Sequence, residues 1–493
     1  MIQIILSDRI YENDVRPIVM SFYPLSEIRF LDINSAKDSQ VSRSQIRLIS
    51  IIFNRTSITI EITDDKGETY RTHNETKDQL LEKLAYKNAM KRQLYNMLSS
   101  LSKKDLPWGI LTGIRPTKLV YDMLDKEIDE KEIYSWMNKE YMCSDEKIEL
   151  SILIAKRERD LLKAMDYKKG YSLYIGIPFC PSTCLYCSFP SFSIEGYGQL
   201  VEDYLRALET EIKFASSCFP GKRLTTVYLG GGTPTTLSAN QLDRLLGIIR
   251  ANFDFTYVRE FCVEAGRPDS ISREKLEVLL NWGVDRISIN PQTMQERTLD
   301  LIGRRHSVDQ INEAFYLARE VGHNNINMDI IIGLPGETSL DVEDTLDKIK
   351  KLNPDSLTVH TLAIKRASRL NIEKDNYLDL RVKDASHMLR VSKEFTKNKG
   401  YLPYYLYRQK NIADNLENVG YARYGKEGLY NILIMEEKQT ILALGSGAMS
   451  KFVFHNEKRI DRVDNVKNLK DYISRIDEMI KRKSDFLNKN PHL

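Results

Sequence analysis

The sequence predicts an α/β fold: a partial (β/α)6 barrel with an α+β domain before it and a small α+β domain after it. Between Tyr171 and about residue 395, apolar runs typical of buried strands alternate six times with stretches of helical periodicity. Such alternation implies parallel strands joined by right-handed crossovers. Glycines or polar residues follow the runs, as they do where ligands bind at the C-terminal ends of barrel strands. We therefore expect a site at that end of the barrel.

The pattern divides the chain into four segments. We expect an N-terminal α+β domain over 1–105, a helical linker region over 106–168, the barrel over 169–395 and a C-terminal domain covering the site over 396–493.

Charge and hydropathy restrict the class of protein. The 493 residues include 72 Lys and Arg against 69 Asp and Glu, a formal net charge of +3, which argues against a broad nucleic-acid-binding face. The sequence has no run of about 20 apolar residues, so we expect no membrane span. The N-terminal stretch MIQIILSDRIYENDV becomes polar too soon for a secretory signal. We expect a cytoplasmic monomer.

The region before the barrel predicts a small β-rich unit followed by helices. MIQIIL, IRLISIIFN and SITIEITDD predict strands, whereas 77–101 and 130–166 repeat apolar positions at helical spacing. Between those helical stretches, Arg115 and Lys118 lie beside a glycine turn. These two cations could hold a carboxylate or a phosphate, or form salt bridges at the surface.

The barrel itself consists of alternating strands and helices. The six expected strands are SLYIGIP, TTVYLGG, REFCVEA, DRISINP, INMDIIIGLP and SLTVHTL. The helices expected around them cover 197–215, 239–251, 272–282, 295–302, 308–321 and 338–350.

Half of the six cysteines lie within eight positions, in YIGIPFCPSTCLYCSF. Cys180, Cys184 and Cys187 are separated by three and then two residues, and so tight a group indicates a metal centre. Three thiolates leave one iron of a [4Fe–4S] cluster without a protein ligand. The alternatives are three structural cysteines under a turn, or a zinc site completed by a distant histidine. The remaining cysteines are scattered, and we interpret them as small buried hydrophobes: Cys143, Cys218 and Cys262.

Residues able to bind a ligand follow the later strands. The run Gly230–Thr235, GGGTPT, lets the backbone approach a ligand, although glycine runs also form ordinary turns. Glu264 closes a strand, where it could accept from hydroxyls or an amine, or cap the next element. Gln292 offers a donor and an acceptor, whereas Arg304 could equally be a solvated surface charge. Asp329 lies inside the apolar run NMDIIIGLPGE, where a carboxylate is costly unless it is paired.

The last segment combines an aromatic stretch with strand and helix patterns. PYYLYRQKN supplies side chains that could line a cavity for a planar macrocycle or a carboxylate, or pack as an aromatic strand: Tyr404, Tyr405, Tyr407 and Arg408. We expect strands at NILIMEE and TILALGSGAMSKF and an amphipathic helix over 465–485. Gly445 and Gly447 could let this segment approach the ligand.

In these motifs, the chain resembles the radical S-adenosylmethionine (SAM) enzymes. The cysteine spacing, the aromatic Tyr186 and the apolar strand before the first cysteine all fit that superfamily. The stretch from about 170 to 395 resembles its coproporphyrinogen III dehydrogenase group through YIGIPFCPSTCLYC, YLGGGTPT, NPQTMQERTLDLIGRRH and MDIIIGLPGET. GILTGIRPTK and LPYYLYRQKNIADNLENVGYA resemble the HemZ branch of that group. The resemblance implies an oxidoreductase of heme and porphyrin biosynthesis that, without oxygen, decarboxylates two propionates of coproporphyrinogen III to vinyls, giving protoporphyrinogen IX.

The resemblance also implies cofactors and site residues. It implies a [4Fe–4S] cluster with the metal ligands Cys180, Cys184 and Cys187. It implies contacts with a cluster-bound SAM for Tyr174, Gly231 and Glu264. Around a second SAM seen in the family, it implies contacts for Tyr186, Gly232, Thr233, Gln292, Arg304, Asp329 and Ala363. The implied partners are a porphyrinogen or another small-molecule substrate and a flavodoxin- or ferredoxin-type electron donor.

Two departures from the family pattern keep other functions open. Gly176 stands where the heme-forming branch has a histidine, two residues after the tyrosine of its cluster strand. The His-Asn-x-x-x-Tyr-Trp segment of the heme-chaperone branch is missing, and NLENVGYARYG stands roughly in its place. The alternatives are a heme-binding, chaperone-like protein that keeps the cluster, and a radical SAM methyltransferase acting on another substrate.

Overall fold

The computed structural model describes residues 1–24, 26–32, 46–113, 115–363, 365, 368–373, 384–409 and 415–493. The chain forms two compact units, one of Met1–Ala155 with Tyr407–Glu417 and one of Lys156–Leu406 with Asn418–Leu493. The first unit thus includes a short stretch that the sequence pattern groups with the C-terminal segment. The division into four segments stays a prediction.

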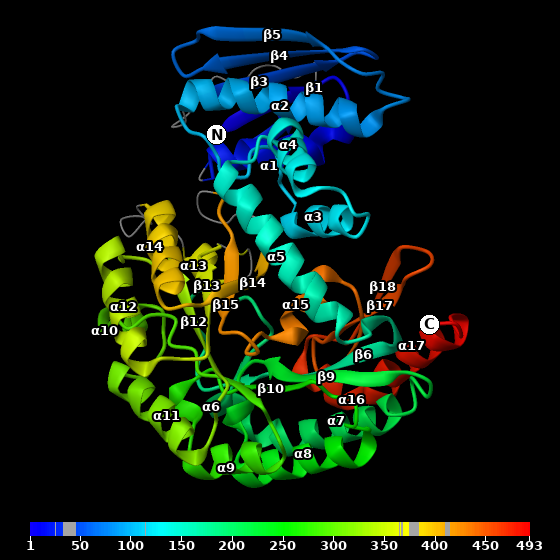
Figure 1. The fold of residues 1–493 in the computed structure, drawn as a ribbon, viewed down its shortest axis with the longest axis vertical. Coiled ribbons are helices and arrows are strands. Elements are labelled where there is room, and N and C mark those ends of the chain that lie inside the picture. The colour runs from blue at the N-terminus through cyan, green and yellow to red at the C-terminus, as the bar shows by residue number, and fades with distance from the viewer. Residues whose placement is uncertain are drawn as a thin grey trace. The chain divides into compact units, whose positions relative to one another are not determined.

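The first unit contains a mixed five-stranded sheet in the order β2-β1-β3-β4-β5. Its strands are β1 (Ile2–Leu6), β2 (Ile28–Leu31), β3 (Ile46–Phe53), β4 (Ser57–Asp64) and β5 (Thr69–Glu75). Strand β1 runs parallel to both neighbours, whereas β3, β4 and β5 form an antiparallel meander. Helices α1 (Glu12–Phe22) and α2 (Lys83–Ser102) cover one face of the sheet (Figure 1). The later helices are α3 (Pro116–Leu124), α4 (Glu130–Tyr141) and α5 (Asp145–Lys163), of which the part from Lys156 belongs to the second unit.

A buried polar cluster joins the stretch 407–417 to the rest of the first unit. The Glu417 carboxylate accepts from the Trp108 indole N–H at 2.8 Å and from Lys147 Nζ at 2.5 Å. Arg408 donates to the Leu111 carbonyl and packs over the Trp108 ring. Charges buried this deeply remain only where they are paired and hydrogen-bonded, so this cluster is structural.

The second unit contains an eleven-stranded sheet, and its centre confirms the predicted parallel array. Six neighbouring strands run parallel in chain order: β6 (Gly170–Ile177), β9 (Arg223–Gly231), β10 (Glu260–Glu264), β11 (Arg286–Ser288), β12 (Ile326–Ile332) and β13 (Ser356–Thr361). Helices on the outer side of this curved sheet connect them (Figure 1): α7 (Val201–Ala215), α8 (Ala239–Asn252), α9 (Arg273–Asn281), α10 (Glu296–Leu301), α11 (Val308–Val321) and α12 (Ser339–Leu352).

C-terminal strands extend this sheet at both ends. Beyond β13 lie β15 (Asn418–Ala422) and β14 (Leu402–Tyr407); beyond β6 lie β16 (Thr440–Leu444), β17 (Met449–Phe454) and β18 (Arg459–Asp464). Strand β16 runs parallel to β6. Among the described residues, the end strands β14 and β18 do not pair with each other, so the barrel is partial, as predicted.

One predicted strand is wrong. NILIMEE forms part of helix α15 (Leu429–Glu436), not a strand. The segment is apolar over most of its length, and such a run has no periodicity that separates a strand from a buried helix. The Glu260 carboxylate accepts the backbone N–H groups of Leu429 and Tyr430 and so caps the helix from a distant strand. The predicted C-terminal helix is present as α16 (Leu469–Ser474) and α17 (Ile476–Lys489).

None of the helices in the described part of the chain is long and apolar enough to cross a bilayer.

Candidate functional site

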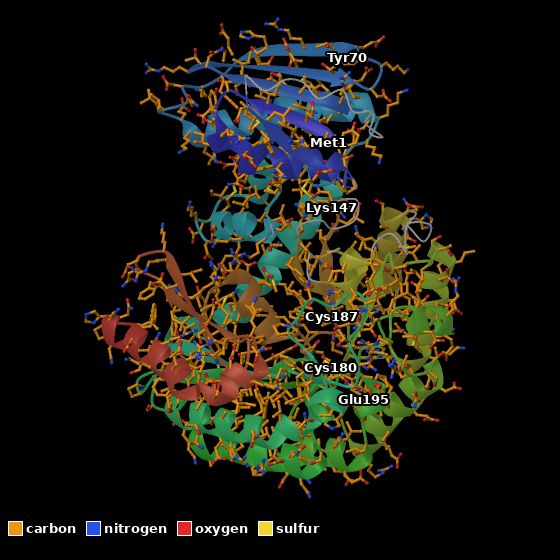
Figure 2. All side chains as sticks on the ribbon, turned by 180° about the vertical axis from the view of Figure 1, so that it is seen from behind. Met1, Tyr70, Lys147, Cys180, Cys187 and Glu195 are labelled. Atoms are coloured by element: carbon orange, nitrogen blue, oxygen red, sulfur yellow. The ribbon has the colours of Figure 1, made fainter. Side chains whose placement is uncertain are left out.

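The three clustered cysteines follow strand β6, with Cys180 ending the short strand β7 (Phe179–Cys180) and the other two on the loop after it (Figure 2, where Cys180 and Cys187 are labelled). All three are free thiols. Burial raises the pKa of Cys180 to about 11 and also raises that of Cys187. Both are therefore protonated at neutral pH until a metal displaces the proton. The loop is anchored by the Leu185 N–H, which donates to the Ile302 carbonyl at 2.9 Å.

The three free thiols of this loop are a donor set that fits an iron–sulfur cluster with one iron left open. Within the ranges that the structure describes, no three His, Cys, Asp or Glu side chains lie close enough to share one ion. In a [4Fe–4S] cluster each thiolate binds its own iron, so the sulfurs need not converge on one point. Around Cys180 the loop is cradled by Gly232, where an added Cβ would lie 3.0 Å from the cysteine sulfur and 2.5 Å from the Phe179 carbonyl oxygen.

The glycine run lies directly beside the cysteine loop because β6 and β9 pair in register. Gly176 is opposite Gly230, and Ile177 is opposite Gly231. Gly231 has a φ of 106°, in the left-handed region that favours glycine. The Thr233 hydroxyl donates to Cys180 Sγ at 3.6 Å. Side chains larger than hydrogen would fill this space, so the run exposes backbone groups next to the cysteines.

Glu264 lies at the end of β10, under the glycine run and within a group of tyrosines. It accepts a hydrogen bond from the Tyr228 hydroxyl. The rings of Tyr174, Tyr228 and Tyr430 stack, with the Tyr228 and Tyr430 centroids 4.4 Å apart. Burial raises the pKa of Glu264 to about 7, although the Tyr228 hydroxyl acts in the opposite direction. A half-buried carboxylate of this kind is available to a cationic ligand group. Tyr228 was not predicted as a site residue, although it shares a strand face with Gly230.

Asp329 and Gln292 meet at the next strands. The Gln292 N–H donates to the Asp329 carbonyl at 2.9 Å, and Gln292 has a φ of 67°. The Asp329 carboxylate accepts from Asn327 Nδ2 at 2.7 Å and lies 3.7 Å from His360 Nε2. Burial alone would raise the pKa of Asp329, but hydrogen bonding with His360 and Asn327 outweighs it, so the pKa lies below its usual value. His360 was missed; the β12–β13 register, with Asp329 opposite Thr358, could have located it. Ala363 is buried just after β13.

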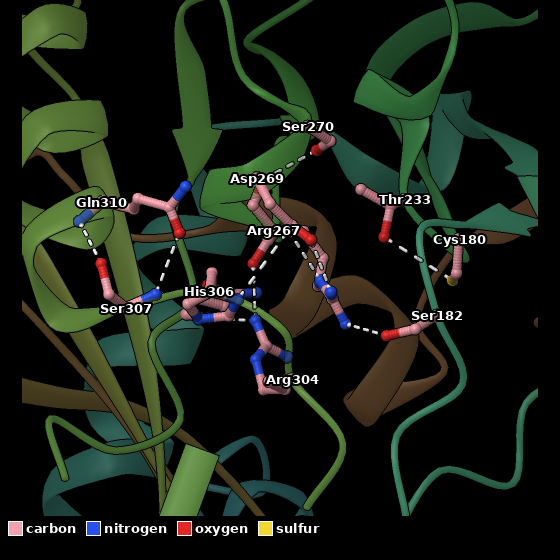
Figure 3. Close-up of polar contacts among 12 residues, drawn as sticks. Cys180, Ser182, Thr233, Arg267, Asp269, Ser270, Arg304, His306, Ser307 and Gln310 are labelled. Atoms are coloured by element: carbon pink, nitrogen blue, oxygen red, sulfur yellow. Dashed lines mark hydrogen bonds and ion pairs between the residues drawn. The ribbon is translucent and has the colours of Figure 1, made fainter. Parts of the chain in front are cut away.

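Arg304 is buried beside the cysteine loop, not solvated (Figure 3). Its guanidinium donates to the Tyr186 hydroxyl at 3.3 Å, to the carbonyls of Gly266 and Asn290, and towards Cys184 Sγ at 4.0 Å. The structure therefore brings Arg304 and Tyr186 together at the cluster loop.

Arg267, three residues after Glu264, lies 3.8 Å from the same sulfur through Nη1 and forms an ion pair with Asp269 (Figure 3); neither residue was predicted. Burial and the neighbouring guanidiniums lower the pKa of His306, which lies 3.8 Å from Asp269, to about 3, so this histidine is neutral.

Other candidates have structural roles. Lys118 forms an exposed salt bridge with Asp122, and Arg408 belongs to the buried cluster of the first unit. Tyr404 and Tyr405 pack against each other in β14, as in the aromatic-strand alternative. Gly445 approaches the backbone of the cysteine strand, since an added Cβ would lie 2.6 Å from the Gly176 carbonyl oxygen.

Comparison with known proteins agrees with this geometry. The model of the radical SAM superfamily matches residues 174–349. The oxygen-independent coproporphyrinogen-III oxidase-like protein HemZ of Bacillus subtilis (strain 168) is 43% identical over 418 residues, which is 83% of each chain. The heme chaperone HemW of the same organism is 32% identical over 311 residues, 62% of this chain and 76% of the relative. The coproporphyrinogen III oxidase HemN of Escherichia coli superposes with a TM-score of 0.51 at 25% identity, over 65% of this chain and 73% of that one.

The similarity to HemZ extends over most of both chains. The chain therefore belongs to the radical SAM superfamily and, within it, to the HemZ family of oxygen-independent coproporphyrinogen-III oxidase-like proteins.

Proposed function

We propose that this protein is a radical SAM oxidoreductase that converts coproporphyrinogen III to protoporphyrinogen IX without oxygen. The observation that carries the proposal is the juxtaposition of three free thiols, a side-chain-free glycine run and the half-buried Glu264 carboxylate at one end of the parallel sheet. The likeness to a coproporphyrinogen III oxidase in both sequence and structure supports the substrate.

The proposed division of labour follows from the donor types. Cys180, Cys184 and Cys187 would each bind one iron of a [4Fe–4S] cluster and leave one iron for the amine and carboxylate of SAM. Glu264 would receive the cationic part of that SAM, with Tyr174 and Gly231 shaping its space.

A second SAM would be held by residues at the neighbouring strand ends. Asp329 supplies a carboxylate, Arg304 a cation and Gln292 an amide, as binding of a charged and polar cofactor requires. The other proposed contacts are Tyr186, Gly232, Thr233 and Ala363.

When bound, the cluster and SAM would supply a 5′-deoxyadenosyl radical for removal of a propionate β-hydrogen, after which loss of CO2 and of one electron to a one-electron acceptor would leave the vinyl group. The chain's own part is to place the substrate and exclude water. The rings of Tyr174, Tyr228 and Tyr430 stack on one another, and the Tyr228 hydroxyl donates to Glu264, which would hold that side chain in place. We further propose a cytoplasmic monomer that takes electrons from a flavodoxin- or ferredoxin-type protein.

Anaerobic turnover tests this proposal. Protein reconstituted with iron and sulfide is mixed with SAM, dithionite and coproporphyrinogen III, and the products are identified by mass spectrometry. Loss of two CO2 per porphyrinogen together with 5′-deoxyadenosine supports it. Formation of deoxyadenosine with an unchanged porphyrinogen would refute the substrate.

The heme-chaperone alternative is tested by a second measurement beside the turnover assay. The HemW relative is similar over 76% of its length, so heme binding should be measured on the same preparation. Tight heme binding without turnover would favour a chaperone-like protein, and methylation with release of S-adenosylhomocysteine would favour a methyltransferase.

A further inference from the structure

Two buried guanidiniums point at one of the three cluster cysteines. Arg267 Nη1 lies 3.8 Å from Cys184 Sγ, and Arg304 Nη1 lies 4.0 Å from the same sulfur. Both arginines are at least 95% buried, with exposed fractions of 3% and 4%. Cys180, by contrast, accepts from the uncharged Thr233 hydroxyl.

A bidentate ion pair fixes the direction of Arg267. Its Nε and Nη2 donate to the two carboxylate oxygens of Asp269 at 2.9 and 2.6 Å. The remaining nitrogen, Nη1, is thereby turned towards Cys184 and also donates to the Ser182 hydroxyl at 3.0 Å (Figure 3). Fork-on-carboxylate geometry of this kind fixes the plane of the guanidinium. Asp269 thus both orients the donor and offsets its charge.

Arg304 is held by backbone carbonyls and not by a carboxylate, and the family resemblance implies that it contacts a second SAM. Two of its hydrogen bonds go to the carbonyls of Gly266 and Asn290. Arg267 and Asp269 have no role in the SAM contacts proposed above, so a different task is open to them.

We propose that Arg267, oriented by Asp269, is a positioning residue that sets the reduction potential of the cluster by donating a charge-assisted hydrogen bond to Cys184. The inference rests on the proposed cluster. A reduced cluster carries one more negative charge than an oxidised one, so a donor and a positive charge at a ligand sulfur favour reduction. Asp269 limits that effect with its nearby negative charge. The pair therefore lets the cluster accept its electron while keeping it a strong reductant.

The two members of the pair predict shifts of opposite sign. In Arg267→Met the donor and the positive charge are lost and Asp269 stays, so the midpoint potential should become more negative. In Asp269→Asn the negative charge is lost, while the amide oxygen can still accept a hydrogen bond from Arg267 and keep its direction, so the potential should become more positive. The control is Arg273→Met, which removes an exposed arginine paired with Glu320 on the same unit; its potential should equal that of the wild type.

The measurement is a redox titration of reconstituted protein without SAM, followed by electron paramagnetic resonance, with iron and sulfide counted for every variant. Opposite shifts support the inference; shifts in the same direction, or none, overturn it. If Arg267→Met does not retain its iron, Asp269→Asn decides alone, and a potential that fails to rise overturns the inference. A wild type that takes up no cluster would instead refute the proposed function on which the inference rests.

Discussion

Replacing Gly232 with alanine tests the close contact between the glycine run and the cysteine loop. The added Cβ would lie 2.5 Å from the Phe179 carbonyl oxygen, 2.9 Å from the Ile177 carbonyl oxygen and 3.0 Å from Cys180 Sγ. The loop is held in place by two backbone hydrogen bonds: the Gly232 N–H donates to the Ile177 carbonyl at 2.8 Å, and the Thr233 N–H donates to the Phe179 carbonyl at 2.7 Å. Overpacking against such fixed neighbours costs about 1–3 kcal/mol.

We therefore expect Gly232→Ala to lower the free energy of unfolding by about 1–3 kcal/mol and to reduce the iron bound after reconstitution. The assays are denaturant unfolding of the unloaded protein and an iron count of the loaded one. Gly221→Ala is the matched control, since no atom lies within 4 Å of the Cβ it adds. A Gly232 variant that equals the wild type in both stability and iron content would refute this account of the loop.

Three further predictions concern charge. Burial raises the pKa of Glu264 to about 7, so its carboxylate becomes protonated below that pH, and SAM affinity measured by calorimetry should fall as the pH drops from about 8 to about 6. Tyr228→Phe removes a hydrogen bond that lowers this pKa, so in that variant the affinity should begin to fall at a higher pH. An affinity that does not depend on pH would rule out Glu264 as the partner of the SAM cation. Asp329→Asn should weaken SAM binding roughly ten- to hundredfold, the value of about 1.5–3 kcal/mol for a charged hydrogen bond, and leave the iron count intact; unchanged affinity removes Asp329 from the site. Glu211 forms a fully buried ion pair with Lys483 at 2.8 Å. Glu211→Gln should therefore lower the free energy of unfolding by about 3–5 kcal/mol, because it leaves the Lys483 ammonium without its counter-charge. Glu209→Gln, at the more exposed pair with Lys213, should change stability little, and equal effects of the two substitutions would contradict this account of the buried pair.

The barrel could be predicted because its signals are local. Each strand–helix unit shows a change of hydrophobic period within about 40 residues, and the structure confirms all six units. NILIMEE was assigned wrongly because its environment is not local: the Glu260 carboxylate, from a strand far earlier in the chain, caps the helix that it forms. The position of β16 beside β6 likewise depends on contacts between residues more than 250 positions apart.

The site was predictable to the extent that its residues belong to sequence motifs. Cysteine spacing and the glycine run mark the loop, and the parallel register brings them together. Arg267 and His360 carry no such mark, because an arginine after a strand or a histidine within one is usually structural. Only the distances from Arg267 to Cys184 and from His360 to Asp329 distinguish them. The aromatic stretch of β14 was ambiguous for the same reason, since a packed strand and a cavity wall share one composition.

The central claim is that the three loop cysteines hold a cluster that cleaves SAM. The most direct measurement compares the wild type with Cys184→Ala after anaerobic reconstitution, counting iron and the 5′-deoxyadenosine formed with dithionite and SAM. We predict that the wild type binds about four irons and forms deoxyadenosine, and that the variant loses cluster iron and SAM cleavage together. Full cleavage by Cys184→Ala would contradict the account.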